Sequence, residues 1–153
     1  MDVHGREGLF WDSIAGRAPV PRAAATLGFE LLDADPDGGW IEVAFTATEA
    51  FTNPMGEVLG GFLAAMVYDT VGPALLATLA PDEFQETLEL KTTFVAPARP
   101  GRLLGRGRVI ARRDRLAFLD ATLTDSSGRL VATGTATATV ILIHADGDPS
   151  PEP

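Results

Sequence analysis

The feature that most constrains the fold is the apolar stretch GEVLGGFLAAMVYDTVGPALL at residues 56–76. Beyond Glu57 its only charged side chain is Asp69. Gly72 and Pro73 interrupt the stretch, so it is a poor membrane span and a buried helix is the better interpretation. The pattern predicts a helix from about residue 57 to 79. We expect a kink or a loosened turn at Gly72-Pro73, because Pro73 has no N–H to donate to the Asp69 carbonyl.

Strand-like segments lie on both sides of this helix. Residues 28–48 contain the turn sequence DPDGG before an alternating apolar run, which predicts a β-hairpin. Residues 86–143 contain alternating and Thr- and Val-rich runs, which predict three or four long strands. A helix that is apolar nearly all round must be covered on most sides. The expected fold class is therefore α+β, with a curved antiparallel β-sheet wrapped around one long central helix.

The chain of 153 residues is long enough for one domain with a substantial core. We expect a short helix and a linker over residues 1–23, the main domain over residues 24–143 and a disordered tail over residues 144–153. One helix covers only one face of the sheet. This arrangement predicts self-association that continues the sheet or pairs two helices.

Composition and histidine placement narrow the function. A net charge of −9 argues against nucleic-acid binding, and the absence of cysteine excludes disulfides and thiolate metal sites. The two histidines, His4 and His144, lie in the terminal segments, where a histidine-dependent triad is not expected. No P-loop, G-x-G-x-x-G or H-E-x-x-H motif occurs, and no secretion signal, so a cytoplasmic protein without a metal or cofactor is expected. The function classes that remain are catalysis by a carboxylate group and ligand binding without catalysis.

The pattern Asn53-x-x-Gly56-x-x-Leu59-Gly60-Gly61, followed by an acidic residue on the helix, resembles the hotdog-fold acyl-CoA thioesterases of the phenylacetate-pathway (PaaI-like) type. That family's motif commonly reads N-x-x-G-x-x-H-G-G. The similarity covers about residues 27–142, including TLELKTTFVAPARPG and DSSGRLVATGTAT. It implies a hotdog fold, hydrolysis of a small or aromatic acyl-CoA and a homodimer or homotetramer. Coenzyme A would enter only as part of the substrate.

The two glycines have a physical role that the residues themselves suggest. At a helix start, the Gly60 and Gly61 amides have no intrahelical partner, and the helix dipole adds positive charge there. A thioester carbonyl on these donors would be polarised and its oxyanion stabilised. The alternative is that the glycines only permit tight packing. By resemblance, Asn53 would hold the thioester or a water molecule and Thr87 would orient that water; a turn residue and a strand hydroxyl are the alternatives.

The acidic position departs from the family pattern. The family carboxylate falls nine residues after the motif histidine, which is Leu59 here, so that position holds Tyr68 and Asp69 is one residue late. Adjacent helix residues point about 100° apart. Three hypotheses stay open. In the first, Asp69 faces the site and acts as base or nucleophile while Tyr68 lines the pocket. In the second, Tyr68 takes the catalytic place, which leaves a catalytically weak acyl-CoA-binding protein. In the third, Asp69 has a structural role, accepting hydrogen bonds or pairing with an arginine.

Candidate substrate contacts come from two further groups. Seven of the twelve basic residues lie within residues 99–115. Of these, Arg99, Arg102 and Arg108 are placed to bind the phosphates of coenzyme A, unless the cluster is only a solvated hairpin. Leu59, Phe62, Met66 and Tyr68 could narrow an acyl pocket, although core packing would explain them equally well. A hotdog dehydratase or hydratase is disfavoured, because those enzymes generally use a histidine.

Overall fold

The computed structural model describes residues 1–143. Its elements are α1 (Leu9–Ile14), α2 (Arg22–Leu27), β1 (Glu30–Asp35), β2 (Trp40–Ala47), the short 3₁₀ helix η1 (Glu49–Phe51), α3 (Gly60–Leu76), β3 (Glu83–Phe94), β4 (Gly101–Arg113), β5 (Leu116–Asp125) and β6 (Leu130–Leu142). The strands form one six-stranded sheet in the order β1-β2-β4-β5-β6-β3, and each neighbouring pair is antiparallel.

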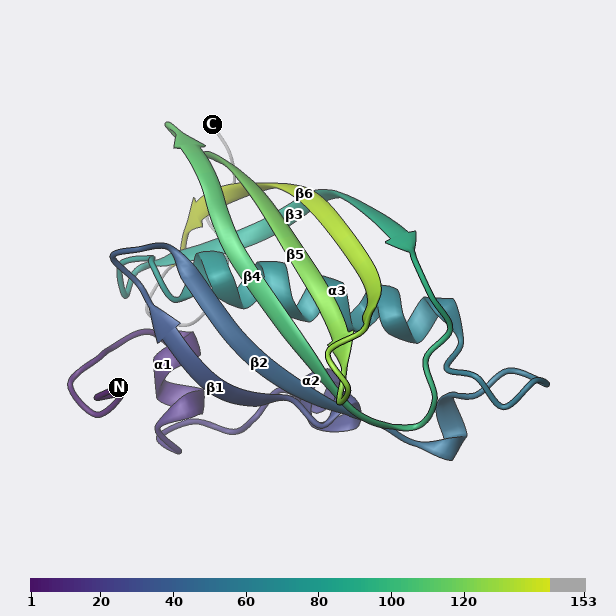
Figure 1. Cartoon of the computed structure of the whole chain (residues 1–153). Coiled ribbons are helices and arrows are strands. Elements are labelled where there is room, and N and C mark those ends of the chain that lie inside the picture. The colour runs from purple at the N-terminus through teal and green to yellow at the C-terminus, as the bar shows by residue number, and fades with distance from the viewer. Residues whose placement is uncertain (144–153) are drawn as a thin grey trace.

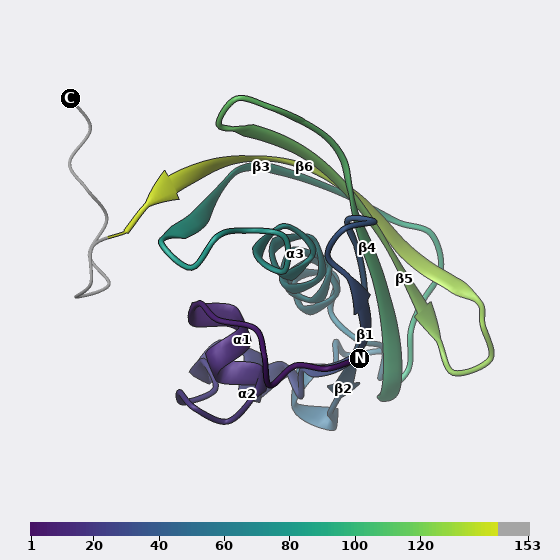
Figure 2. The ribbon, with the colours of Figure 1, turned by 90° about the vertical axis from the view of Figure 1, so that its left-hand side faces the viewer.

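The sheet curves around α3 (Figure 1), and viewed from the side it arches over the helix while α1 and α2 lie across from it (Figure 2). The core forms where the helix meets the sheet, and Met66, Val67 and Val71 of α3 are fully buried. This arrangement confirms the predicted α+β class with one long central helix. It also confirms the hairpin and the long strands after the helix.

Three glycines allow the helix to approach the sheet closely. Along β4, buried Leu103, Gly105 and Gly107 alternate with exposed residues, so the two glycines face α3. An ideal β-carbon would lie 2.4 Å from Thr70 Oγ1 at Gly105 and 2.8 Å from the Thr70 carbonyl oxygen at Gly107. At Gly134 of β6 it would lie 2.4 Å from Val67 Cγ1. The absent side chains leave the space that α3 occupies.

A side chain added at one of these positions should destabilise the fold. We expect Gly105→Ala to lower the free energy of unfolding by about 1–3 kcal/mol, because Thr70 must move. Urea denaturation measures the change. Thr70→Ala removes the nearest atom, so the double variant should lose less than the two single losses added together. Simple additivity would show that the helix does not limit the space at Gly105.

Two predicted boundaries differ from the structure. The sequence RAPVPRAAAT at residues 17–26 predicts a proline-rich connector, but α2 forms over Arg22–Leu27, because its alanines and leucine favour helix and Pro21 stands at its N-cap. The predicted boundary between residues 23 and 24 falls inside α2. The long helix begins at Gly60 instead of residue 57, since the Val58 and Leu59 amides donate to Ala98 and Phe51 carbonyls.

The C-terminal end of α3 also differs from expectation. The helix remains helical on both sides of Pro73, so the proline does not interrupt it, and it ends at Leu76 instead of residue 79. None of the described helices is long and apolar enough to cross a membrane. The predicted tail over residues 144–153 lies outside the described residues.

Strand β3 forms one edge of the sheet and carries exposed apolar side chains. A register shift between Thr87 and Glu89 leaves Leu88 without a partner on β6. Leu88 is 60% exposed, and Phe94 and Val95 at the end of the strand are more than half exposed. An edge with unpaired backbone groups and apolar side chains is suited to pairing with another chain. The free edge of β3 is thus a candidate surface for self-association.

Candidate active site

The loop before α3 is organised by Asn53. Its side-chain Oδ1 accepts hydrogen bonds from the Met55 amide at 2.9 Å and the Glu57 amide at 3.1 Å. Its backbone carbonyl accepts from the Gly56 amide at 2.9 Å. Gly56 has a φ of +75°, a conformation that favours glycine. Asn53 therefore acts as a turn residue, as one hypothesis held, and only its Nδ2 group remains for a ligand.

The N-terminus of α3 offers the expected donors. The amides of Gly60 and Gly61 donate to no backbone acceptor within the described part of the chain, and no side chain caps the helix. An ideal β-carbon on Gly60 would lie 3.1 Å from the Phe94 ring, whereas one on Gly61 would meet only Leu59 Cδ2 at 4.0 Å. Close packing thus explains Gly60 in part, but it does not explain Gly61. Two free amides at a helix N-terminus can bind a carbonyl oxygen or an oxyanion.

Asp69 lies partly buried in the second half of the same helix. Its Oδ2 atom is buried and accepts no hydrogen bond from the described residues. Desolvation by burial raises the pKa of Asp69 from 3.8 to about 6. The structural hypothesis for Asp69 expected donors or an arginine partner, and neither contacts the buried oxygen. A carboxyl group with a pKa near 6 is suited to accept a proton at neutral pH.

Tyr68 and Asp69 point to different sides of the helix. Tyr68 is 46% exposed and lies one turn before Gly72, which faces the Gln85 side chain of β3. Asp69 lies about 100° around the helix, on the side of Phe62 and Ala65. The regular winding of α3 keeps the Tyr68 and Asp69 side chains pointing in different directions.

Thr87 lies on the inner side of β3, opposite the buried Ala138 of β6. Its hydroxyl donates to Gln85 Oε1 at 3.3 Å, and the Gln85 Nε2 atom would lie 3.1 Å from a β-carbon on Gly72. Thr87 and Gln85 thus lie beside the face of α3 that carries Gly72, one turn from Tyr68. Sequence reasoning missed Gln85, although a glutamine within an alternating strand that proves 93% buried is an unusual core residue.

The proposed acyl-pocket residues divide into two groups. Leu59 and Tyr68 are about half exposed, so they are free to contact a ligand. Phe62 stacks on Phe51 of η1 with ring centroids 4.1 Å apart and an interplanar angle of 6°. This stack fixes the loop before α3 against the helix. Phe62 therefore has a packing role whether or not it also contacts an acyl group.

Arg99 is the one candidate phosphate ligand that the structure brings to the motif loop. Its Nη1 lies 3.4 Å from the Met55 carbonyl oxygen and 3.5 Å from that of Gly56. Arg102 and Arg108 lie on the outer face of the sheet, because they alternate with the buried Leu103 and Gly107. Sequence reasoning grouped the three arginines by proximity in the chain, which does not show which face of a strand each one occupies.

Both outer arginines are ion-paired. Arg102 Nη1 lies 2.9 Å from Glu30 Oε2, and Arg108 makes two 2.8 Å hydrogen bonds to the Asp120 carboxylate. Arg108 borders an open cleft of about 650 Å³ on the outer face. Its lining residues are Trp40, Arg106, Gly107, Arg108, Asp120, Ala121, Thr122 and Thr133. Arg106 is paired with Glu42, so both guanidinium groups in the cleft are already neutralised.

The chain is similar to known thioesterases. The thioesterase superfamily profile matches residues 55–132. The structure of a phenylacetic acid degradation-related protein from Ralstonia eutropha JMP134 is 39% identical and superposes with a TM-score of 0.82 over 85% of this chain and 98% of that chain. The comparison with curated protein sequences gave no match.

Two more distant structures share the fold. A thioesterase family protein from Silicibacter pomeroyi has a TM-score of 0.75 at 24% identity, over 88% of this chain and 99% of that one. The E. coli PaaI protein from the phenylacetic acid degradation operon has a TM-score of 0.75 at 17% identity, over 85% and 91%. Together with the family match and the 39% identity, these similarities confirm the PaaI-like resemblance. The chain belongs to the thioesterase superfamily and is a thioester hydrolase with a hotdog fold.

Proposed function

We propose that this thioesterase hydrolyses a small or aromatic acyl-CoA, with Asp69 as base or nucleophile and Gly60 as oxyanion donor. Gly61, Asn53 and Thr87 have supporting roles. The observation that carries the proposal is the Asp69 carboxyl group, which is partly buried, has an oxygen without a hydrogen-bond partner and has a pKa raised to about 6. Burying such a group without compensation destabilises the fold, which a catalytic use would explain.

The steps follow from the chemistry of these groups. Above pH 6 the ionised Asp69 takes a proton from a water molecule as the water oxygen bonds to the thioester carbon. The carbonyl oxygen becomes an oxyanion, which the free amides at the start of α3 stabilise. Collapse of this intermediate breaks the carbon–sulfur bond and expels the coenzyme A thiolate, which takes the proton held by Asp69. In the nucleophile version, the Asp69 carboxylate bonds to the thioester carbon and the thiolate leaves. Water then hydrolyses the resulting anhydride and regenerates the Asp69 carboxylate.

We infer from the spacing along α3 that a complete site with these roles needs two copies of the chain. Gly60 and Asp69 are nine residues apart, which corresponds to about 13 Å along a helix. One carbonyl group cannot contact both groups of a single helix. A second subunit that places its α3 against the first would supply the missing half, and the exposed Tyr68 and Leu59 lie on the accessible part of the helix. We therefore propose a homodimer with shared sites, and pairs of such dimers would give a homotetramer.

The free edge of β3 is the surface that this dimer would use. We expect Leu88→Asp to shift the protein toward monomer and to lower activity at least about tenfold, because a buried unpaired charge opposes association. Analytical ultracentrifugation and hydrolysis assays at one subunit concentration measure both effects. Ile110→Asp is the matched control, since Ile110 is 55% exposed against 60% for Leu88 but lies on an inner strand. Dimers that persist in Leu88→Asp would remove β3 from the interface.

Arg99 is the candidate best placed to bind the phosphates of coenzyme A, because its guanidinium lies beside the motif loop. Arg102 and Arg108 are paired with Glu30 and Asp120, which weakens their attraction for the phosphates of coenzyme A. We therefore expect Arg99 to contribute most of any affinity for coenzyme A.

The substrate class is tested by single-turnover hydrolysis of short, long and aromatic acyl-CoAs with detection of the released thiol. Turnover of the short or aromatic esters supports the proposal. Turnover of the long-chain esters alone would contradict the proposed class.

A second candidate is a catalytically weak acyl-CoA-binding protein. The observation in its favour is that Tyr68, at the family's acidic position, is 46% exposed, whereas Asp69 is partly buried. Calorimetry that shows tight binding of an acyl-CoA without turnover would support it. So would a rise in hydrolysis on Tyr68→Asp.

A further inference from the structure

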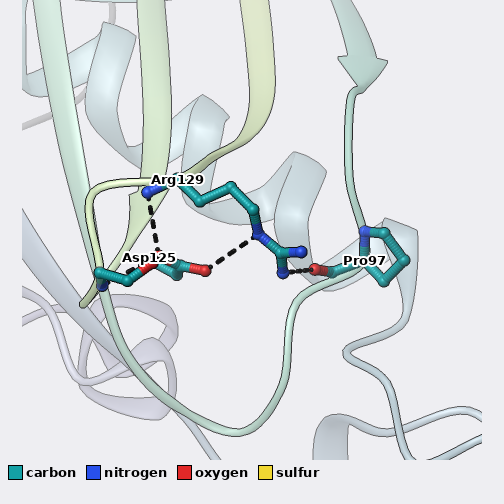
Figure 3. A network of polar contacts seen from close by, with 4 residues as sticks. Pro97, Asp125 and Arg129 are labelled. Carbon is teal, nitrogen blue, oxygen red and sulfur yellow. Dashed lines mark hydrogen bonds and ion pairs between the residues drawn. The ribbon is translucent and has the colours of Figure 1, made fainter.

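The turn between β5 and β6 contains a network of polar contacts centred on Arg129 (Figure 3). The Arg129 Nε atom donates to Asp125 Oδ2 at 3.2 Å, and its Nη2 atom donates to the Pro97 carbonyl oxygen at 2.6 Å. Asp125 also accepts from the Ser127 hydroxyl at 2.6 Å and from the Ser127 and Arg129 amides at 3.0 Å each. These hydrogen bonds, the one from Ser127 first, lower the pKa of Asp125, so the carboxylate remains charged beside Arg129.

Pro97 belongs to the segment 95–100, which connects β3 with β4 and passes beside the motif loop. The Val58 amide, two residues before α3, donates to the Ala98 carbonyl at 2.8 Å. Arg99 of the same segment reaches the Met55 and Gly56 carbonyls. Ala98 itself is buried. Hydrogen bonds therefore link Asp125 through Arg129 to Pro97, and link Ala98, the next residue along the chain, to Val58, two residues before the helix start.

We infer that Arg129 is a positioning residue for the Gly60 and Gly61 amides, acting through the segment 95–100. The inference rests on the proposed role of those amides as oxyanion donors. The planar guanidinium donates from one nitrogen to a carboxylate and from another to a carbonyl in a fixed geometry. Lysine at this position could hold Asp125 or Pro97, but it would not fix their relative position.

The effect on catalysis follows from the geometry of oxyanion binding. Hydrogen-bond donors stabilise the developing oxyanion well only when they lie about 2.7–3.1 Å from it. A small displacement of the donors therefore slows the reaction substantially. Loss of the hydrogen bond from Arg129 to the Pro97 carbonyl would let the segment 95–100 shift by a fraction of the donor–oxyanion distance. Val58 and the helix start would shift with it. Such a movement weakens transition-state binding more than substrate binding. The variant should therefore lose kcat with little change in KM.

The test compares Arg129→Met with Arg112→Met as a matched control. Arg112 Nη2 donates to Glu83 Oε2 at 3.0 Å and its Nε atom donates to the Asp114 carbonyl at 3.4 Å, so it is also shared between a carboxylate and a backbone oxygen. It lies at the end of β4, whereas the segment 95–100 precedes the start of that strand. We expect kcat to fall about tenfold to a hundredfold in Arg129→Met, with KM within about threefold of the parent value. Arg129→Lys should fall between the parent and Arg129→Met.

Amide hydrogen exchange gives a readout that does not depend on activity. Arg129→Met should speed exchange in peptides that cover residues 53–61, and Arg112→Met should not. A parent-like kcat in Arg129→Met, an equal loss in both variants, or unchanged exchange over residues 53–61 would each overturn the inference. If the parent protein hydrolyses no acyl-CoA while exchange responds as expected, the proposed substrate fails and the structural link from Arg129 to the helix start stands.

Discussion

Asp69→Asn is expected to lower kcat for acyl-CoA hydrolysis by about 10²–10⁴-fold, the usual contribution of a general base. Asparagine keeps the shape of the side chain but cannot accept a proton. In the parent protein the ionised form of Asp69 is the active one, and its pKa is about 6. The logarithm of kcat/KM should therefore rise with unit slope up to about pH 6 and level off above it. Stopped-flow detection of the released thiol across this pH range measures both effects.

Two further variants make the Asp69 experiment decisive. Asp82→Asn is the matched control, because Asp82 is an exposed carboxylate in the turn after α3 and should leave the profile unchanged. Tyr68→Phe removes only the phenol hydroxyl. A large loss in Tyr68→Phe together with undiminished activity in Asp69→Asn would assign the chemistry to Tyr68 and remove Asp69 from the mechanism.

Asp69→Asn should also stabilise the folded protein at neutral pH. The folded-state pKa of Asp69 is about 6, against 3.8 for the unconstrained group, so the folded state binds the proton more tightly than the unfolded state. Below pH 3.8 both states are protonated, and Asp69 adds no pH dependence. As the pH rises toward 6 the unfolded state ionises first, and the free energy of unfolding falls by up to about 3 kcal/mol.

Asparagine avoids this loss because it carries no charge. Asp69→Asn should therefore raise the free energy of unfolding at pH 7.5 by up to about 3 kcal/mol relative to the parent, and the difference should vanish well below pH 3.8. Urea denaturation at several pH values measures it, with both proteins at one subunit concentration because association contributes to stability. A constant difference across the pH range would mean that Asp69 is not desolvated in the folded state.

Most of the fold could be predicted from local patterns. The apolar run around Asp69 requires cover on most sides, and the alternating strands after it supply that cover, so the pattern predicts a sheet wrapped around a helix. The predicted connector at residues 17–26 shows the limit of such reasoning, since its two prolines obscured the short α2. The start of the long helix depends on hydrogen bonds from Val58 and Leu59 to distant carbonyls, which no local pattern reveals.

The candidate site could be predicted only in part. The spacing of Asn53, Gly56, Gly60 and Gly61 identified the loop and helix start, and the structure brings these residues together. The directions of Tyr68 and Asp69 depend on how α3 rotates against the sheet, which the sequence leaves open. The contact from Arg129 to Pro97 joins segments that are 32 residues apart, so the network at the turn could not be found without coordinates.

The separation of Gly60 and Asp69 along a single helix affects how the activity of the protein responds to dilution. If each reaction centre draws one half from each of two molecules, an isolated folded molecule is inert toward thioesters. Below the concentration at which pairs form, turnover then varies with the square of the amount present, and the fold can persist where the chemistry does not.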